Sequence, residues 1–504
     1  MHHTLGIERN QIQMFCSEQY IEQDSFVRVI DAFVDAIDLN SFGFRHVITG
    51  EEGRPPYHPS VLLKLYIYGY RYGIRSSRKL ERQAKINLEV RWLLCEQVPS
   101  NRTIAYFRKE YSEAFRNVFR KFVFLLKQAQ LIEGETIAID SFKVRGQNSL
   151  KNNFNDKKIS RHKEYIDNKI SEYEQALDNS DNEEERSELE HKIERQKVRK
   201  AKYESIETQL EDSNQEQISL TDPDSRAVIL HRNIVQVGYN IQASVDAKNK
   251  LITYFDTGDV NDTRALAPIA INTKSALGLD TMNVLADKGY HTGDQLQQCA
   301  FANIITYVSP KAPSTKDIGL YSVSAFNYNP ESDTYTCPAG EVLTTNNVWY
   351  RHSSEGKTSS FRFKRYLSSK CGSCLQRNIC TNSDRNGRAI DRSEYADIIA
   401  QNASRVNDSP NYYRLRQQIA EHPWGTLKRQ WAFDYVLMRG KRQVLGEVSL
   451  AFIGYNLMRS VRIMTPRKFI EMLLIKPLLL QTTLNQTPFS PVDSVFLEKH
   501  KMAS

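Results

Sequence analysis

The stretch Glu135-Thr-Ile-Ala-Ile-Asp140-Ser-Phe-Lys-Val144 marks the start of a sheet in a chain that is helical before it. Apolar and polar residues alternate along this stretch, and many are good strand formers, so it predicts a β-strand. Asp140 lies inside the strand, where a buried carboxylate without a partner would be costly. The stretch therefore predicts a sheet that holds an acidic group, although an isolated Asp can also be a turn or capping residue.

Residues 1–130 predict a helical N-terminal domain. Helices are expected over 59–72, from Ser76 or Ser77 to Trp92, and from Ser100 or Asn101 to Gln130, each begun by a capping residue. The last segment carries an aromatic stripe, which we interpret as core packing, and a set of cations that includes Arg102, Arg108 and Lys109. These three cations are DNA-binding candidates because basic helices suit phosphate contact. A solvated helix face is an equally good interpretation.

Residues 131–310 predict the first part of an α/β core with a mixed sheet. Strands are expected over 226–259, at Asn283–Asp287 and over 304–308, and helices over 264–276 and 293–302. Apolar residues at heptad-like spacing over 155–212 predict an inserted helical hairpin with coiled-coil character. Residues 311–400 look loop-rich, 401–464 return to helices of the core, and 465–504 form a short helix and a tail.

Two further acidic residues, Asp287 and Glu421, are candidate metal ligands. Asp287 ends an apolar strand, and Gly289 allows a tight turn after it. Carboxylates at neighbouring strand ends can share a hard cation such as magnesium, although each Asp alone could simply cap a turn. Glu421 stands just before Pro423, where a helix is expected to kink or restart, among cations that include Arg416. The pattern alone leaves open whether Glu421 is an ion-pair partner or a metal ligand.

Four of the seven cysteines crowd into residues 337–380. They are Cys337, Cys371, Cys374 and Cys380, and the Cys-x2-Cys pair lets two sulfurs reach one tetrahedral zinc. We expect a structural zinc, with a reduced empty cluster and disulfides as the alternatives.

The bulk composition is that of a globular protein with several domains. The chain has 504 residues, 40% hydrophobic and 25% charged, with a formal net charge of +8 that is compatible with a polyanionic partner. No signal peptide is visible at the start, and the apolar stretch Phe469–Leu480 is too short and broken to span a bilayer. We therefore expect a cytoplasmic protein without a membrane partner.

Several blocks together resemble one family. Asp140-Ser141, Leu285-Ala-Asp287-Lys-Gly-Tyr290 and Glu421-His-Pro-Trp-Gly-Thr-Leu-Lys428-Arg429, followed by Tyr455-Asn-Leu-Met-Arg459, resemble the three signature regions of DDE transposases of bacterial insertion sequences. Gly53-Arg-Pro-Pro-Tyr-His58-Pro59 and Thr103-Ile-Ala-Tyr-Phe107-Arg108 resemble the helical N-terminal domain of that group, and Leu220-Thr-Asp-Pro-Asp-Ser-Arg226 and Val237-Gly-Tyr-Asn-Ile241 resemble its core. The resemblance covers nearly the whole chain in the right order.

The resemblance implies a ribonuclease H-like core in which Asp140, Asp287 and Glu421 are catalytic and hold two Mg²⁺ ions, which Mn²⁺ can replace. It implies cleavage and strand transfer of DNA at terminal inverted repeats, insertion into target DNA, a homodimer on DNA and association with the nucleoid. Lys428 and Arg429 would hold a phosphate, whereas Arg416 lies one residue further from Glu421 than in the best-known pattern.

Alternatives remain at this point. Glu447 is the second candidate for the third acid, and Tyr290 and His291 could contact DNA, orient Asp287 or simply pack. A catalytically inactive relative that binds terminal DNA as a repressor is a competing function, which the intact acids disfavour. A nuclease that cuts without joining is another.

Overall fold

The computed structural model describes residues 10, 14–45, 47, 56–212, 215–231, 234–311, 319–352, 361–383 and 387–475. The chain forms two compact units. The first comprises Met1–Asn261, Asn272–Leu279 and Gln417–Ser504, and the second comprises Asp262–Ile271 and Asp280–Arg416. Within the described ranges, every helix is too short or too polar to cross a membrane.

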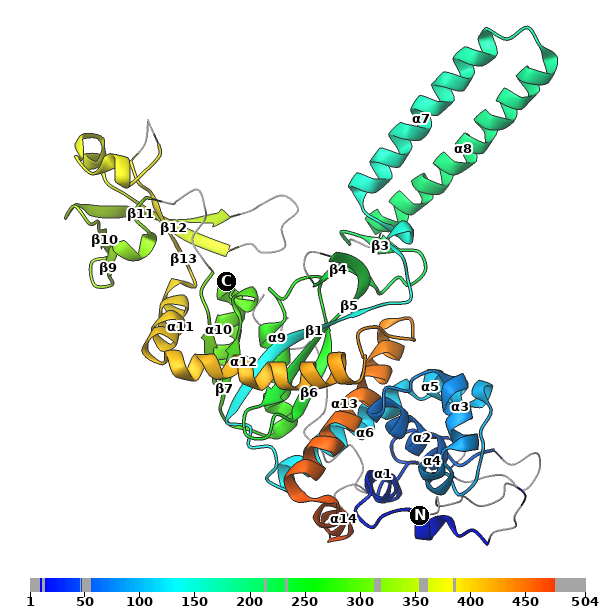
Figure 1. Cartoon of the computed structure of the whole chain (residues 1–504). Coiled ribbons are helices and arrows are strands. Elements are labelled where there is room, and N and C mark those ends of the chain that lie inside the picture. The colour runs from blue at the N-terminus through cyan, green and yellow to red at the C-terminus, as the bar shows by residue number, and fades with distance from the viewer. Residues whose placement is uncertain are drawn as a thin grey trace, which may run out of the picture. The chain divides into compact units, whose positions relative to one another are not determined.

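The first unit begins with a group of helices (Figure 1), and aromatic side chains pack between them. They are η1 (Ser17–Tyr20), α1 (Phe26–Asp35), α2 (Pro59–Arg71), α3 (Ser77–Ile86), α4 (Leu88–Leu93), α5 (Asn101–Glu110) and α6 (Ser112–Gln128). Phe107 stacks on Phe44 and Tyr66, with ring centroids 5.8 and 6.2 Å apart. This packing confirms the expectation that the aromatic stripe of residues 101–130 is core.

Two of the predicted N-terminal helices are each divided in the structure. Asn87 ends α3 and caps α4, because its side chain accepts a hydrogen bond from the Val90 amide. Tyr111 divides α5 from α6. Ser100 caps α5 by accepting from the Thr103 amide, as predicted. The apolar spacing continues across both breaks, so periodicity alone could not reveal them. Of the block 53–59, residues 53–55 lie outside the described part.

The sheet of the first unit is built on β1 (Thr136–Arg145). β1 pairs antiparallel with β5 (Ile234–Asp246), and Asp140 lies opposite Ala243. β5 also pairs antiparallel with β4 (Arg226–His231) and β6 (Ile252–Gly258). The 155–212 insertion is a helical hairpin of α7 (Asp156–Asp178) and α8 (Glu183–Asp212), as predicted, with η2 (Leu150–Asn152), β2 (Asn153–Phe154) and β3 (Ile218–Ser219) at its base.

C-terminal helices complete the first unit. α12 (Pro410–Trp424) enters it at Gln417 and continues as a π-helical turn, η8 (Gly425–Gln430), so the helix does not stop at Pro423 but changes its hydrogen-bond register. α13 (Lys441–Met464) follows, and its Phe452 lies 4.8 Å from Phe255 of β6 between ring centroids. α14 (Pro466–Ile475) is the last described element. The predicted tail beyond it, residues 476–504, lies outside the described part.

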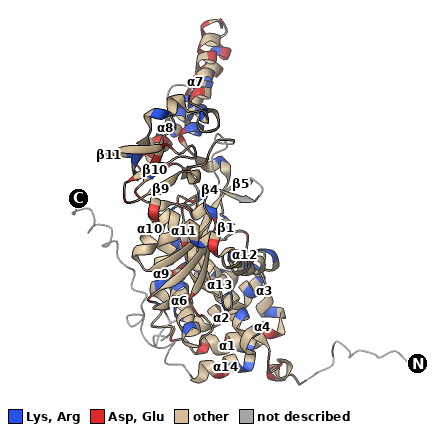
Figure 2. Ribbon diagram, turned by 90° about the vertical axis from the view of Figure 1, so that its left-hand side faces the viewer, with Lys and Arg blue, Asp and Glu red and all other residues tan. Residues whose placement is uncertain are grey.

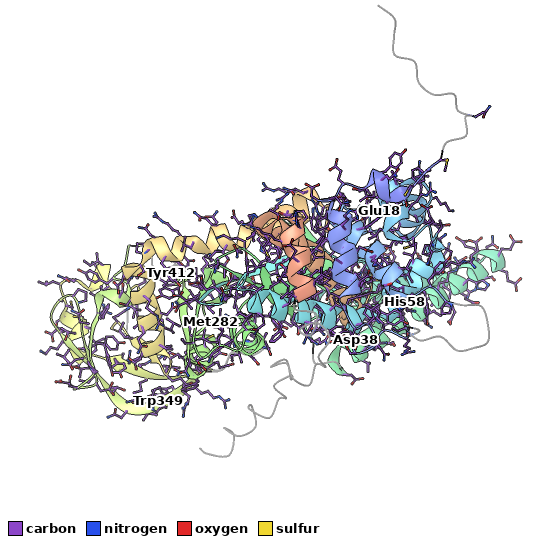
Figure 3. The ribbon with its side chains drawn as sticks, turned by 90° about the horizontal axis from the view of Figure 1, so that it is seen from below. Glu18, Asp38, His58, Met282, Trp349 and Tyr412 are labelled. Atoms are coloured by element: carbon purple, nitrogen blue, oxygen red, sulfur yellow. The ribbon has the colours of Figure 1, made fainter. Side chains whose placement is uncertain are left out.

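The second unit contains a parallel strand pair, β7 (Met282–Ala286) and β8 (Ile304–Val308). They are connected through η3 (Lys288–Tyr290) and α10 (Gly293–Phe301), and α9 (Leu266–Leu277) is divided between the two units. α11 (Ala396–Asp408) is tied to β8, because the Asn402 amide bonds both the N–H and the carbonyl of Val308. Tyr412, labelled with Met282 of β7 in Figure 3, packs at 4.8 Å on Tyr307 of β8. Antiparallel and parallel pairs both occur, so a mixed α/β fold is confirmed.

The 311–400 segment, predicted to be loop-rich, also contains a sheet that the prediction missed. It contains a five-stranded antiparallel sheet in the order β13-β12-β11-β10-β9. The strands are β9 (Asn327–Asn329), β10 (Thr334–Thr336), β11 (Val342–His352), β12 (Phe361–Leu367) and β13 (Ile390–Ser393), with short turns η5 (Val323–Ala325), η6 (Ser369–Ser373) and η7 (Arg377–Ile379). Tyr366 and Ile390 lie in a small core of their own. Because this core contains few residues, the strands carry little of the apolar alternation by which a strand is predicted.

Candidate active site

Asp140 is half-buried in the middle of β1. Successive strand residues face opposite sides, so Asp140 shares one face with Phe142, which is fully buried. Asp140 Oδ1 accepts a hydrogen bond of 2.8 Å from the Ser141 amide. The carboxylate thus lies at the edge of an aromatic core.

Trp424, at the end of α12, reaches this carboxylate from a distant part of the chain. Its indole Nε1 donates to Asp140 Oδ2 at 3.3 Å, and its ring lies 4.9 Å from the Phe142 ring. The aromatic contact fixes the indole, and the N–H then fixes the carboxylate. Trp424 belongs to a signature block, but nothing in its sequence position indicated this role.

Lys428 lies in the π-helical turn, on the same aromatic surface. Its Nζ is 4.9 Å from the Phe142 ring centroid. Burial lowers the pKa of Lys428, and the nearby Asp140 carboxylate opposes that shift. The structure therefore brings Lys428 into the electrostatic field of Asp140. The next residue, Arg429, is exposed.

Glu421 is exposed on α12, where Gln417 Nε2 donates to its Oε1 at 2.9 Å. Glu421 precedes Trp424 by three residues, so the two lie on neighbouring turns of one helix face. The following residue, His422, faces the interior, and its Nδ1 lies 2.8 Å from the Tyr455 hydroxyl. The segment that carries Glu421 is therefore anchored from both sides of the helix.

The signature block 455–459 has a structural role in the first unit. The Tyr455 hydroxyl donates to the Lys250 carbonyl, and Arg459 Nε donates to the Asn249 carbonyl, both at 2.8 Å. The Asn456 side chain bonds the backbone N–H and carbonyl of Ile252. These contacts fasten α13 to the turn between β5 and β6.

The block 220–226 joins the beginning of α13 to the same sheet. Asp222, only 1% exposed, accepts from the Tyr239 hydroxyl at 2.8 Å and from the Gly440 amide at 3.1 Å. Asp224 accepts from the Lys441 amide at 2.7 Å. An anionic group at a helix N-terminus satisfies free N–H groups and the helix dipole.

Asp287, in the second unit, follows β7 directly and begins η3. Its Oδ1 accepts from the Gly289 amide at 2.8 Å. A Cβ added at Gly289 would stand 2.9 Å from Asp287 Oδ1 and 3.6 Å from Asp262 Oδ2. Gly289 therefore leaves room for two carboxylates that approach the same point, and Asp262 is an acid that sequence reasoning missed.

The loop of Asp262 is fastened to the turn after Asp287. The Thr292 hydroxyl donates to the Thr263 carbonyl at 2.9 Å, and Gln295 Oε1 accepts from the Ala267 amide at 3.0 Å. Tyr290, in the same turn, is fully buried, which favours the packing interpretation for this residue. Asp262 stands between strand and helix like an ordinary capping residue, so its position gave no signal.

The predicted DNA-binding cations differ in their accessibility. Arg102 and Lys109 are exposed on α5, and Arg416 on α12 is half-buried. Arg108 is only 7% exposed and donates to the Arg75 carbonyl at 2.8 Å. Arg108 is thus a core residue, and its prediction as a DNA contact does not fit the structure. Arg108 lies on the buried side of α5, next to the buried residues Ile104 and Phe107.

Glu447, the alternative third acid, is fully buried in α13. Its Oε2 accepts from the Leu437 and Met438 amides at 2.8 and 3.0 Å, and its Oε1 lies 3.8 Å from the Arg75 guanidinium. This environment gives Glu447 a structural role, holding the segment before α13 in place.

The four clustered cysteines line one small hollow in the second unit, together with Arg377 and Arg388. None of them forms a disulfide. Burial raises the pKa of the Cys380 thiol, Arg388 opposes this shift, and the other three thiols add to it. Across the described ranges, no group of three or more His, Cys, Asp or Glu side chains has the spacing of a formed metal site. The thiols are gathered, but not at ligand distances from a common centre.

Two family models match the chain. Residues 15–110 match a transposase domain (DUF772), and residues 336–461 match a transposase DDE domain. The chain is a transposase of the DDE type. The second match includes Glu421, Trp424 and Lys428, whereas Asp140 and Asp287 lie outside both matched ranges.

Other comparisons add little. No curated protein matches this transposase. A solved structure described as a piggyBac transposase synaptic complex with hairpin DNA is 8% identical, with a TM-score of 0.27, over 95% of this chain and 85% of that one. The assignment as a transposase therefore rests on the two family models, and the DDE type rests on the second of them.

Proposed function

We propose that this transposase cuts and joins DNA at the terminal inverted repeats of an insertion sequence, with Asp140, Asp287 and Glu421 as its catalytic acids in a ribonuclease H-like core. The observation that carries this proposal is the contact between Trp424 and Asp140, which are 284 positions apart in the sequence. This contact brings the helix of Glu421 to the strand of Asp140.

The donor chemistry of the acids suits a hard divalent cation, because carboxylate oxygens are the ligands that Mg²⁺ prefers. Two Mg²⁺ ions, or Mn²⁺ in their place, would supply activation of a water or a DNA 3′-hydroxyl and neutralise charge on the leaving oxygen. Asp262 adds a carboxylate beside Asp287. Lys428, in the field of Asp140, would offer its ammonium group to a phosphate.

DNA contact is proposed for the cations that are accessible. Arg102 and Lys109 on α5, Arg416 on α12, and Arg429 in the π-helical turn each present at least part of their side chain to solvent. Phosphate contacts of this kind give affinity without sequence selectivity. Two ends must be joined in one reaction, so we propose a homodimer on DNA, associated with the nucleoid.

The decisive experiment compares Asp140→Ala with wild type on DNA that carries the element's ends, in the presence of Mg²⁺. Cleaved and joined products should both disappear, while the melting temperature and the affinity for DNA are retained. Asp280→Ala, which changes an exposed aspartate, is the matched control and should leave both products unchanged. Strand transfer at the wild-type rate by Asp140→Ala would refute the assignment, and cleavage without joining by wild type would indicate a nuclease.

We further propose that Cys337, Cys371, Cys374 and Cys380 hold a structural zinc ion, supported by their position around one hollow. Four thiolates would leave no open position for chemistry, so zinc would stabilise the insertion only. Metal analysis of purified protein should find about one zinc per chain, as a four-thiolate site requires. Cys374→Ser should lower that content and Cys95→Ser, at an exposed cysteine of the first unit, should not. Less than half an equivalent in wild type would contradict zinc.

A further inference from the structure

The helical hairpin is firmly anchored at its base. Phe154, Ile159, Ile206 and Leu210 form a small buried core there. Lys158 Nζ donates to the carbonyl oxygens of Leu150, Lys151 and Asn153 at 2.7, 3.0 and 2.8 Å, which ties α7 to the segment that follows β1. The base of the hairpin is therefore tied to the segment that follows the strand of Asp140.

Charge is distributed unevenly along the hairpin. Residues 157–163 and 195–202, here called the basic band, contain four and five Lys or Arg residues and no Asp or Glu. Residues 178–190, the acidic tip, contain seven Asp or Glu residues and one Arg. Figure 2 shows Lys and Arg in blue and Asp and Glu in red along α7 and α8. A hairpin that was only a solvated spacer would not need to separate its charges in this way.

Side chains of the basic band lie close to one another. His162 stacks on Tyr203 at 4.8 Å between ring centroids. The pKa of His162 is lowered by partial burial first and then by Lys158, Arg199 and Arg161, so cations of both helices act on this one side chain.

Most cations of the basic band keep their charge available. Lys163 and Lys200 pair with acids of the hairpin. The other exposed cations form no ion pair with any described residue, and they are Lys157, Arg161, Arg195, Lys197, Arg199 and Lys202. The band therefore presents a net positive surface to a polyanion.

A polar hollow lies between the end of β1 and the base of the hairpin. Its lining includes Arg145, Gln147, Asn148, Asn152 and Thr221. Arg145 is exposed and ends the strand that carries Asp140 five residues earlier. Cations and amide groups of this kind are the usual partners of phosphate and sugar oxygens.

We propose that the polar hollow and the basic band form a track for the phosphate backbone of double-stranded DNA that leaves the site of Asp140. This inference rests on the proposed function and assigns a role to the hairpin, which lies outside both regions matched by family models. The part of the basic band on α7 has seven residues and is therefore about 10 Å long, enough to contact about three successive phosphates of one strand. Duplex DNA fits better than the acidic tip of a second copy, because the hollow continues the positive surface to Arg145 at the end of the strand that carries Asp140.

The test is a variant that removes four cations of the basic band without changing helix-forming tendency: Lys157→Gln, Arg161→Gln, Arg199→Gln and Lys202→Gln together. The matched control removes four charges of the acidic tip: Asp181→Asn, Glu183→Gln, Glu184→Gln and Glu190→Gln. The probe is a DNA duplex of arbitrary sequence, and affinity is measured by fluorescence anisotropy over a series of salt concentrations. Circular dichroism and thermal melting show whether both variants keep their helices.

The basic-band variant should bind the duplex roughly tenfold or more weakly near 0.1 M salt, and its slope of log K against log salt should be shallower by about 3 to 4. The acidic-tip variant should bind as wild type or slightly more tightly. Equal affinity and slope for the basic-band variant and wild type would overturn the proposal. A change in self-association alone, measured by sedimentation without DNA, would also overturn it and favour the tip of a second copy.

The two proposals fail in different ways. At protein concentrations that saturate the DNA, the basic-band variant should still cleave terminal DNA like wild type, because its acids are intact. Wild type that binds duplex but never cleaves would contradict the proposed function and leave the affinity comparison valid. Loss of cleavage by the variant at unchanged affinity would contradict the track.

Discussion

Asp140 and Asp287 are both aspartates of β-strands or strand ends, but the protein holds them by different means. Asp140 accepts a local hydrogen bond from the Ser141 amide and a second one from Trp424, which lies 284 positions away. Asp287 accepts from Gly289, two residues away. The first carboxylate depends on the packing of a distant helix on an aromatic core, and the second on the geometry of one tight turn.

This difference indicates which substitutions should displace each aspartate. Asp287 is held mainly by local sequence, since its hydrogen bond to the Gly289 amide needs only the turn to form. Asp140 additionally needs the contact of Trp424 with Phe142, so changes far along the chain should disturb it. Substitutions that keep both aspartates can test the turn that holds Asp287 and the Trp424 contact that holds Asp140 separately.

The largest effect is expected from Gly289→Ala. The new Cβ would stand 2.9 Å from Asp287 Oδ1, closer than real contacts allow, so the carboxylate must move. If Asp287 is the metal ligand proposed above, its displacement should reduce strand cleavage by about 10- to 100-fold and raise the Mg²⁺ concentration needed for half-maximal rate. Product gels over a Mg²⁺ titration provide the measurement.

Gly278→Ala is a useful control for general strain, because a Cβ there meets nothing within 4 Å although its φ is +61°. It should cost stability without shifting the Mg²⁺ requirement. An unchanged Mg²⁺ requirement in Gly289→Ala would contradict the role given to the Gly289 turn.

A smaller effect is expected from Trp424→Phe. Phenylalanine keeps the ring contact with Phe142 but removes the N–H that donates to Asp140. Cleavage should fall about tenfold, in the range found when a group that orients a metal ligand is lost, while the melting temperature changes little. Trp431→Phe is the matched control, since that indole Nε1 has no hydrogen-bond partner among the described residues. Equal cleavage rates for the two variants would show that the Trp424 indole N–H does not support catalysis.

The smallest effect is expected from Lys428→Met, measured as stability. Burial lowers the pKa of Lys428, so its charged form opposes folding at neutral pH. That penalty disappears as pH rises through the lowered folded-state pKa toward the unfolded value of about 10.4. The variant should therefore have a larger free energy of unfolding than wild type at pH 7, with the difference narrowing as pH rises. Urea unfolding at several pH values measures this, and a difference that grows with pH would contradict it.

Much of the fold could be predicted from periodicity. The strand of Asp140, the helical hairpin and the β7–β8 region all appear near the predicted residues, because each has a long or alternating apolar pattern. The sheet within 311–400 was missed, since its strands are short, polar and packed on a core of few residues. The inward position of Arg108 was also missed, because a charge on a helix reveals no direction.

The sequence alone determined the local elements, the clustering of cysteines and the two aspartates, since strand alternation and turn residues act over a few positions. Only the tertiary structure decided which side chains support them. Trp424 reaching Asp140, Asp262 approaching the Gly289 turn, and Glu447 buried against Arg75 each join segments that are distant along the chain or divided by a helix or turn. Such contacts depend on how whole helices and strands pack together, so a short sequence pattern cannot predict them.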